Sequence, residues 1–179
     1  MEKIIGISGK MSTGKTTLAN HIAALTGGTV ISFANGLRQE VLEHFCIPIS
    51  IQKDAYSKAT LPVTVGRRTM LLRELLQWWG ALRREGNENY WVDKALKGLG
   101  GGLTIIDDVR YKNEAEAVHA AGGLVFRLDP YDGWEPGIGA EHISETDLDD
   151  WYGFNWRFAP TLGSLPDHAR DLVNTFRLP

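Results

Sequence analysis

The chain has 179 residues, of which 43% are hydrophobic, and this length and composition suit one compact domain with a sizeable core. Its net charge is −3 and it has no long run of Lys or Arg, which excludes the charge pattern of a general nucleic-acid-binding protein. The lone cysteine, Cys46, excludes an internal disulfide and a cysteine-based zinc site, and we expect it to be a partly buried apolar side chain. No apolar run is long enough for a signal peptide or a membrane span, so we expect a cytoplasmic protein without a membrane partner.

Hydrophobic patterning predicts strands that alternate with helices along most of the chain. The predicted strands are residues 3–8, 29–33, 103–108, 123–128 and 151–156. The predicted helices are residues 15–25, 35–45, 69–84, 89–99, 112–121 and 165–176. Residues 47–66 have a mixed pattern, and residues 129–150 are predicted to be a loop. The alternation indicates an α/β fold with a parallel sheet, whose ligands gather at the carboxyl ends of the strands.

A glycine-containing segment, residues 9–16, follows the first predicted strand and matches G-x-x-x-x-G-K-[ST]. In such a loop the backbone N–H groups and the start of the next helix bind phosphate oxygens. Lys15 is expected to reach the β- and γ-phosphates, and Thr16 to bind Mg²⁺. The alternative is a simple turn, but the strand–loop–helix context favours a phosphate loop. The expected nucleotide-binding residues are Gly9, Ser12, Thr13, Gly14, Lys15, Thr16 and Thr17.

Two acidic residues, Asp107 and Asp108, close the apolar strand that begins at Leu103. Carboxylates in this position are costly to place without a cation nearby, which indicates a functional role. A carboxylate here can hold Mg²⁺ through water or accept a proton from an attacking phosphate. We therefore assign Asp107 to the metal and Asp108 to catalysis.

Arginines and polar or aromatic residues between Arg38 and Arg84 are candidates for binding a second substrate. Arg73 and Gln77 lie four residues apart, on one face of a predicted helix. Arginine suits bidentate phosphate binding, and a tryptophan can stack on a base. The alternatives are a charged outer helix face and tryptophans in the core, and both remain open. The candidate acceptor-binding residues are Arg38, Arg73, Gln77, Trp78, Arg83 and Arg84.

The segment "EHISETDLD", which contains His142, suggests either a metal site or a helix cap. The cap is the simpler interpretation, because Ser144 and Asp147 loosely fit a capping box. We assign no catalytic role to this segment.

Taken together, these stretches resemble the bacteriophage-type deoxynucleoside monophosphate kinases, which belong to the P-loop nucleoside monophosphate kinase group. The resemblance rests on "GISGKMSTGKTTLA", "SFANGLRQEV", "RELLQWWGALRR", "IIDDVRYKNEAEAV", "GGLVFRL" and "HISETDLD", which span most of residues 4–149. Relatives have Thr-Glu where this chain has Ala81 and Leu82, so the base remains undefined.

The resemblance implies a three-layer P-loop kinase fold with a central parallel five-stranded sheet. It implies a single domain over residues 1–179, with an inserted helical monophosphate-binding lobe at about 45–95 and a lid at about 129–150. The implied substrates are ATP·Mg²⁺ and a deoxynucleoside monophosphate. The implied catalytic residues are Lys15, Asp108 and Arg110, the last two placed between the two phosphates. The lid role would fall to Arg127, Lys112 or Arg157, or would be supplied by another group.

Other functions remain open at this point. A kinase of another small metabolite, of the phosphomevalonate or dephospho-coenzyme A type, has the same loop. A nucleotide-dependent switch or assembly ATPase is the alternative from a different class, but it does not need the arginines of residues 67–95. A homodimer is also left open, and a phage origin would place the protein in the host cytoplasm.

Overall fold

The computed structural model describes residues 3–97, 99–137, 139–161 and 163–179. These residues divide into two compact units. Unit 1 contains the described residues of 1–32 and 98–179, and unit 2 contains residues 33–97. Unit 2 therefore begins twelve residues before the inserted lobe predicted at 45–95. Gly98 and Ile138, which fall in the predicted 89–99 helix and the predicted lid, lie outside the described residues, as do Met1, Glu2 and Leu162.

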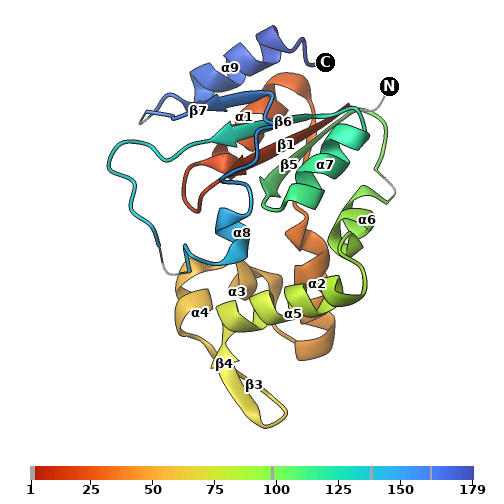
Figure 1. Cartoon of the computed structure of the whole chain (residues 1–179), viewed down its shortest axis with the longest axis vertical. Coiled ribbons are helices and arrows are strands. Elements are labelled where there is room, and N and C mark those ends of the chain that lie inside the picture. The colour runs from red at the N-terminus through yellow and green to blue at the C-terminus, as the bar shows by residue number, and fades with distance from the viewer. Residues whose placement is uncertain (1–2, 98, 138, 162) are drawn as a thin grey trace. The chain divides into compact units, whose positions relative to one another are not determined.

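Unit 1 is built on a parallel sheet of five strands in the order β2-β5-β1-β6-β7 (Figure 1). Each neighbouring pair is parallel, which confirms the predicted α/β fold. The strands are β1 (Lys3–Gly9), β2 (Thr29–Ile31), β5 (Leu103–Val109), β6 (Leu124–Leu128) and β7 (Trp156–Phe158). The helices are α1 (Lys15–Thr26), α7 (Lys112–Ala120), α8 (Ile143–Thr146) and α9 (Leu165–Thr175).

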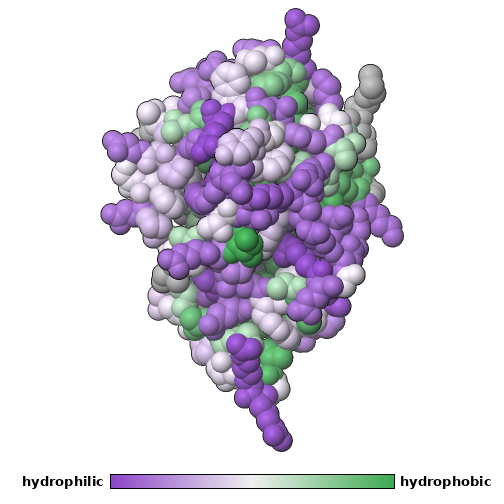
Figure 2. All heavy atoms as spheres, viewed as in Figure 1, coloured by the Kyte–Doolittle hydropathy of each residue, from purple (hydrophilic) through white to green (hydrophobic). Residues whose placement is uncertain are grey.

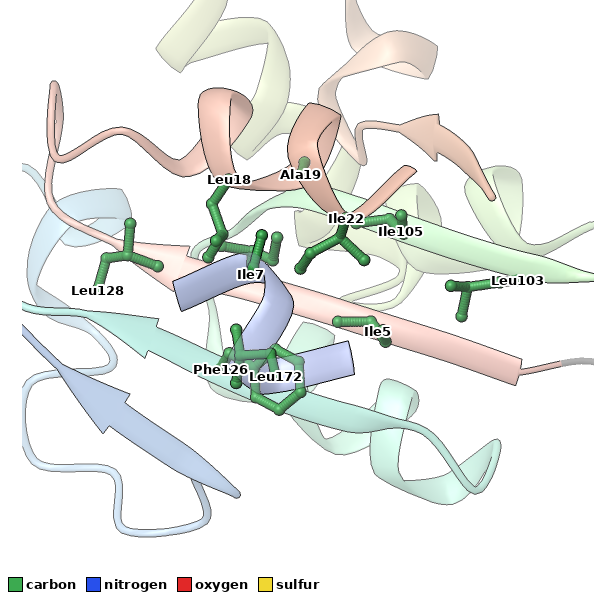
Figure 3. Close-up of a cluster of buried hydrophobic side chains, with 11 residues drawn as sticks. Ile5, Ile7, Leu18, Ala19, Ile22, Leu103, Ile105, Phe126, Leu128 and Leu172 are labelled. Atoms are coloured by element: carbon green, nitrogen blue, oxygen red, sulfur yellow. The ribbon is translucent and has the colours of Figure 1, made fainter. Parts of the chain in front are cut away.

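The core of unit 1 lies between the sheet and the helices α1 and α9. Ile5 and Ile7 of β1 are buried there with Leu18 of α1 and Leu172 of α9 (Figure 3). On the opposite face, a Cβ added at Gly6 would come within 3.4 Å of the Val118 side chain, so α7 packs closely on the sheet. These contacts make the three layers that the resemblance implies.

Unit 2 is mainly helical and has its own hydrophobic core. Its elements are α2 (Ala34–Phe45), α3 (Ile49–Lys53), α4 (Ala55–Thr60), β3 (Pro62–Val65), β4 (Arg68–Leu71), α5 (Leu72–Gly86) and α6 (Tyr90–Leu96). The buried residues of this core are Val41, Ile47, Met70, Leu72, Leu75, Trp79 and Trp91. The core joins α2, α5 and α6, and α2 and α5 carry the six candidate acceptor-binding residues.

Four details of the sequence analysis need correction. The helix predicted at 69–84 begins at Leu72, because β3 and β4 pair as a hairpin across Gly66, whose φ is 61°. The predicted 151–156 strand lies instead at 156–158, since pairing with β6 starts only after Asn155 bonds the backbone of Val125. The predicted 129–150 loop contains α8, and Cys46 is exposed rather than partly buried.

Hydrophilic residues predominate on the face of the molecule shown in Figure 2, and hydrophobic residues are scattered among them. None of the helices formed by the described residues is long and apolar enough to cross a membrane.

Candidate nucleotide-binding site

The loop between β1 and α1 has the backbone of a phosphate loop. Gly14 immediately precedes α1 with φ of 95°, in the left-handed region that favours glycine. A Cβ at Gly14 would lie 2.7 Å from the Leu165 side chain, and one at Gly9 would lie 2.6 Å from the Leu128 carbonyl oxygen. The two glycines of the motif are therefore explained by space as well as by conformation. The loop leads directly into the N-terminus of α1, where backbone N–H groups are available to an anion.

Lys15, the first residue of α1, is buried, with 8% of its surface exposed. Its ammonium group donates hydrogen bonds to the carbonyl oxygens of Gly9 (2.9 Å) and Lys10 (2.5 Å). Burial, together with the nearby positive charge of Arg110, lowers the pKa of Lys15 to about 7. The negative charges of Glu145 and Asp108 oppose this shift. The described residues form no ion pair with Lys15, so a bound phosphate would supply a direct counter-charge.

A hydroxyl and a carboxylate meet beside the loop, where a magnesium ion was predicted. Thr16 donates a hydrogen bond to Asp107 Oδ2 (2.7 Å), and Ser32, directly after β2, donates to Asp107 Oδ1 (2.6 Å). The described residues contain no group of three or more His, Cys, Asp or Glu arranged to hold a metal ion. Thr16 and Asp107 nevertheless fit Mg²⁺, because this ion binds few protein oxygens when nucleotide phosphates and water supply the rest.

Arg110 follows the end of β5 and is engaged by the segment that contains α8. Its guanidinium forms an ion pair with Glu145 and donates a hydrogen bond to the Ser144 carbonyl oxygen (3.3 Å). The second carboxylate oxygen of Glu145 accepts the N–H of Met11 in the phosphate loop (2.8 Å). The structure thus connects Arg110, Glu145 and the phosphate loop in unit 1.

Glu145 and its neighbour Asp149 are residues to which the sequence analysis assigned no role. Lys10 of the loop donates to the Glu145 carbonyl oxygen (2.6 Å) and forms an ion pair with Asp149. The cap of α8 is His142, whose Nδ1 accepts the Ser144 N–H, and not Ser144 as the capping-box pattern suggested. The available signal is the acidic "SETDLD" stretch, for which the sequence pattern favours a helix cap over a metal site.

Three basic residues of unit 1 were considered for the lid role, and they differ in their surroundings. Arg127 is buried at 4% exposure, donates to Ser8 (3.1 Å) and Asp149 (2.8 Å), and is close enough to Lys15 to lower its pKa. Lys112 pairs with the exposed Asp150, and Arg157 pairs with Asp129. Arg127 is therefore the one of these three residues whose charge acts on Lys15.

In unit 2, α5 carries most of the predicted acceptor-binding residues. Arg73 and Gln77 are half-buried, and Trp78 is 37% exposed. The Nε of Arg73 is buried and lacks a hydrogen-bond partner among the described residues. Arg38 of α2 is also half-buried and donates to the side chain of Asn35 (3.2 Å). Arg84 is half-buried near the end of α5.

Arg83 differs from the other arginines of α5, because a buried carboxylate engages it. Glu40, at 3% exposure, accepts hydrogen bonds from Arg83 (2.8 Å), Trp79 (3.0 Å), Tyr90 (2.5 Å) and Lys94 (2.7 Å). Burial acts to raise the pKa of Glu40, but these four hydrogen bonds outweigh it and lower the pKa to about 2. The charge of Arg83 is thus paired inside unit 2, and its role toward an acceptor stays a prediction.

Comparison with known proteins identifies similar kinases. The chain is 26% identical, over an alignment of 165 positions that covers 81% of each protein, to a protein of Acanthamoeba polyphaga mimivirus named "Putative deoxynucleotide monophosphate kinase". No protein-family model matches the chain.

Among solved structures, a sugar kinase from a Janibacter species superposes with a TM-score of 0.51 at 14% identity, over 99% of this chain and 96% of that one. A shikimate kinase from Acinetobacter baumannii gives a TM-score of 0.47 at 11% identity, over 98% and 92% of the two chains. The parallel sheet and the likeness to the Janibacter enzyme show that the chain has a P-loop kinase fold. With the mimivirus relative, they support a P-loop kinase that acts on a small molecule.

Proposed function

We propose that the protein transfers the γ-phosphoryl group of ATP to a deoxynucleoside 5′-monophosphate and so forms a diphosphate. The observation that carries this proposal is Lys15, a buried ammonium group held against a phosphate loop with a pKa of about 7. The name of the mimivirus relative supports the choice of acceptor.

In unit 1, each proposed role follows from the chemistry of the side chain. Lys15 neutralises the β- and γ-phosphates, and Thr16 with Asp107 would hold Mg²⁺, which would supply further positive charge to the nucleotide. Asp108 and Arg110, at the carboxyl end of β5, act on the acceptor phosphate. Catalysis then comes from positioning and charge neutralisation, since phosphoryl transfer needs little covalent help from the protein.

In unit 2, we propose that residues 33–97 form the acceptor-binding lobe. Arg73 supports this role because its buried Nε has no hydrogen-bond partner among the described residues, and a phosphate oxygen would satisfy it. Arg38 and Arg84 add positive charge, and Gln77 and Trp78 are available to a base. Residues 129–150 are the proposed lid, and the reaction takes place in the cytoplasm, where both substrates occur.

A coupled assay of ADP release tests the proposal. ATP·Mg²⁺ is supplied with dAMP, dCMP, dGMP, dTMP or hydroxymethylated pyrimidine monophosphates in turn, and a reaction without acceptor is the control. We expect one or more monophosphates to stimulate ADP release at least about 100-fold, since a kinase that excludes water transfers to its acceptor rather than to solvent.

Other outcomes of this assay would contradict the proposal. ADP release that does not depend on an acceptor would indicate an ATPase switch. Stimulation by phosphomevalonate or dephospho-coenzyme A alone would indicate a kinase of another metabolite.

A further inference from the structure

We propose that Glu145 is a positioning residue, which holds Arg110 beside the phosphate loop in the orientation needed for phosphoryl transfer. This inference rests on the proposed function, because it assigns Glu145 a part in that reaction. The inference adds Glu145, in the segment that contains α8, to the proposed site residues of the phosphate loop and of the end of β5.

The two oxygens of one carboxylate join two elements of unit 1. Glu145 Oε2 accepts the backbone N–H of Met11 at 2.8 Å, and Oε1 forms the ion pair with the guanidinium of Arg110. The side chain of Glu145 is only 10% exposed and that of Arg110 is 24% exposed. Charge-assisted hydrogen bonds of this kind are stronger and more directional than neutral ones, and solvent screens them little in a partly buried site.

Arg110 is fixed at its backbone as well as at its head group. The carboxylate of Glu114, which is 2% exposed, accepts the N–H of Arg110 at 2.8 Å. The guanidinium also donates to the carbonyl oxygen of Ser144 at 3.3 Å. A long arginine side chain normally samples many rotamers, so fixing it at both ends pre-organises its charge before a substrate binds.

The position of Glu145 is itself held by several contacts. Lys10 donates to its carbonyl oxygen at 2.6 Å, and the Lys112 N–H donates to Asp147 at 2.8 Å. Arg127 donates to Asp149 at 2.8 Å. Segment 145–149 is thus tied to the phosphate loop, to the start of α7 and to β6, which gives the Glu145 carboxylate a defined place.

The charge of Glu145 has a further consequence at Lys15. Arg110 and Glu145 both lie close enough to Lys15 for their charges to act on it, so the carboxylate offsets part of the repulsion between the two cations. Without Glu145, Arg110 would be free to turn away from Lys15. The ion pair therefore keeps two like charges close enough to act on neighbouring phosphates.

The test compares the wild type with Glu145→Gln, Arg110→Lys and the double variant. Glu145→Gln keeps the shape of the side chain and an acceptor for the Met11 N–H but removes the charge that holds Arg110. We expect kcat to fall at least about tenfold in each single variant, while the KM for ATP changes less than about threefold. The double variant should lose no more than about threefold beyond the single ones, because the two residues act as one unit.

Controls separate a positioning role from a loss of stability. Glu116→Gln removes an exposed carboxylate of α7, outside the proposed lid, and should leave kcat unchanged. Glu145→Asp keeps the charge and should recover part of the lost kcat. The stability of every variant is measured first by urea unfolding. The kinetic assay is then run under conditions in which even the least stable variant is fully folded.

Three results would overturn the inference while leaving the kinase proposal intact. The first is an unchanged kcat in Glu145→Gln, and the second is full additivity in the double variant. The third is ATP binding that tightens tenfold or more in Glu145→Gln, measured by calorimetry without acceptor, which would make Glu145 a competitor of the nucleotide. Absence of acceptor-dependent activity in the wild type would instead contradict the proposed function.

Discussion

Each unit of this protein contains a buried ionisable group whose pKa is strongly shifted, Lys15 in unit 1 and Glu40 in unit 2, and the surroundings of these two groups are opposite. In unit 1, the described residues offer Lys15 two loop carbonyls as hydrogen-bond acceptors, and its pKa falls to about 7, which means that its charge is disfavoured. In unit 2, Glu40 receives four hydrogen bonds, two of them from cations, and its pKa falls to about 2, which means that its charge is favoured.

The difference separates a binding role from a structural one. A buried charge that lacks a counter-charge is a charge prepared for a ligand, because binding an anion recovers the energy that burial cost. A buried charge that is fully paired contributes to the fold and offers nothing to a ligand. Lys15 should therefore be dispensable for folding and needed for turnover, and Glu40 should be the reverse.

Substituting the lysine is expected to give the largest effect. Lys15→Ala should lower kcat by at least about 10²–10³-fold, the usual loss when one charge-stabilising donor is removed. Its unfolding free energy should not fall, since the amine it removes is poorly solvated in the folded state. Steady-state kinetics and urea unfolding check both parts, and near-normal turnover would refute the phosphate-loop assignment.

Substituting Glu40 should lower the stability of the fold rather than the rate of turnover. Glu40→Gln should lower the unfolding free energy by about 3–5 kcal/mol, because it leaves the partners of a buried ion pair uncompensated. Glu43→Gln, at an exposed position of the same helix, is the matched control and should have little effect. Equal stability of the two variants in urea would mean that the Glu40 cluster is not structural.

The same carboxylate predicts the acid sensitivity of unit 2. Glu40 has a lower pKa folded than unfolded, so its stabilisation is complete above its ordinary value of 4.5 and is lost as the pH falls towards about 2. Urea midpoints measured at pH 5 and pH 3 should therefore differ more in the wild type than in Glu40→Gln. The same pH dependence in both proteins would assign acid sensitivity to other groups.

The proposed acceptor-binding role of unit 2 predicts an effect of intermediate size on the KM for the monophosphate. Arg73→Ala should raise the KM for the monophosphate about 10- to 100-fold, in line with the loss of hydrogen bonds to a charged group, and change the KM for ATP much less. Arg67→Ala removes an exposed arginine at the hairpin turn of the same unit and serves as the control. An equal rise of both KM values in Arg73→Ala would show that Arg73 is structural.

The smallest expected effect is a pH dependence of ATP binding. Above pH 7 the free protein increasingly holds Lys15 neutral, whereas bound phosphate favours the charged form, so binding takes up a proton. The affinity for ATP should fall by at most tenfold per pH unit above pH 7. Calorimetry at pH 8 in buffers of different ionisation enthalpy should show proton uptake in the wild type and none in Lys15→Ala.

Local patterns predicted most of unit 1. The apolar runs around Ile5, Ile105 and Phe126 indicated buried strands, and residues 9–16 indicated the loop, because both signals lie within one short stretch of sequence. The hairpin before α5 was missed, since four-residue strands give a weak alternation that merged with the helical pattern of residues 72–84.

Long-range pairing could not be predicted in the same way. Glu145 contacts Met11 across 134 residues of sequence, and Arg83 pairs with Glu40 across 43. The sequence pattern around a charged residue does not indicate which residue will pair with it. Arg83 therefore looked equivalent to Arg84, and Glu145 looked like part of a cap. The roles of paired charges depend on the folded chain, whereas the loop motif is local.

The most direct test of the account is to follow the γ-phosphoryl group itself. ATP labelled at the γ-phosphate is incubated with Mg²⁺, the wild-type protein and the monophosphate that most stimulates ADP release, and the labelled products are separated. We expect label in the deoxynucleoside diphosphate, with Lys15→Ala giving at most about a hundredth of the wild-type rate. Label that appears only as inorganic phosphate, or transfer that survives Lys15→Ala, would contradict this expectation.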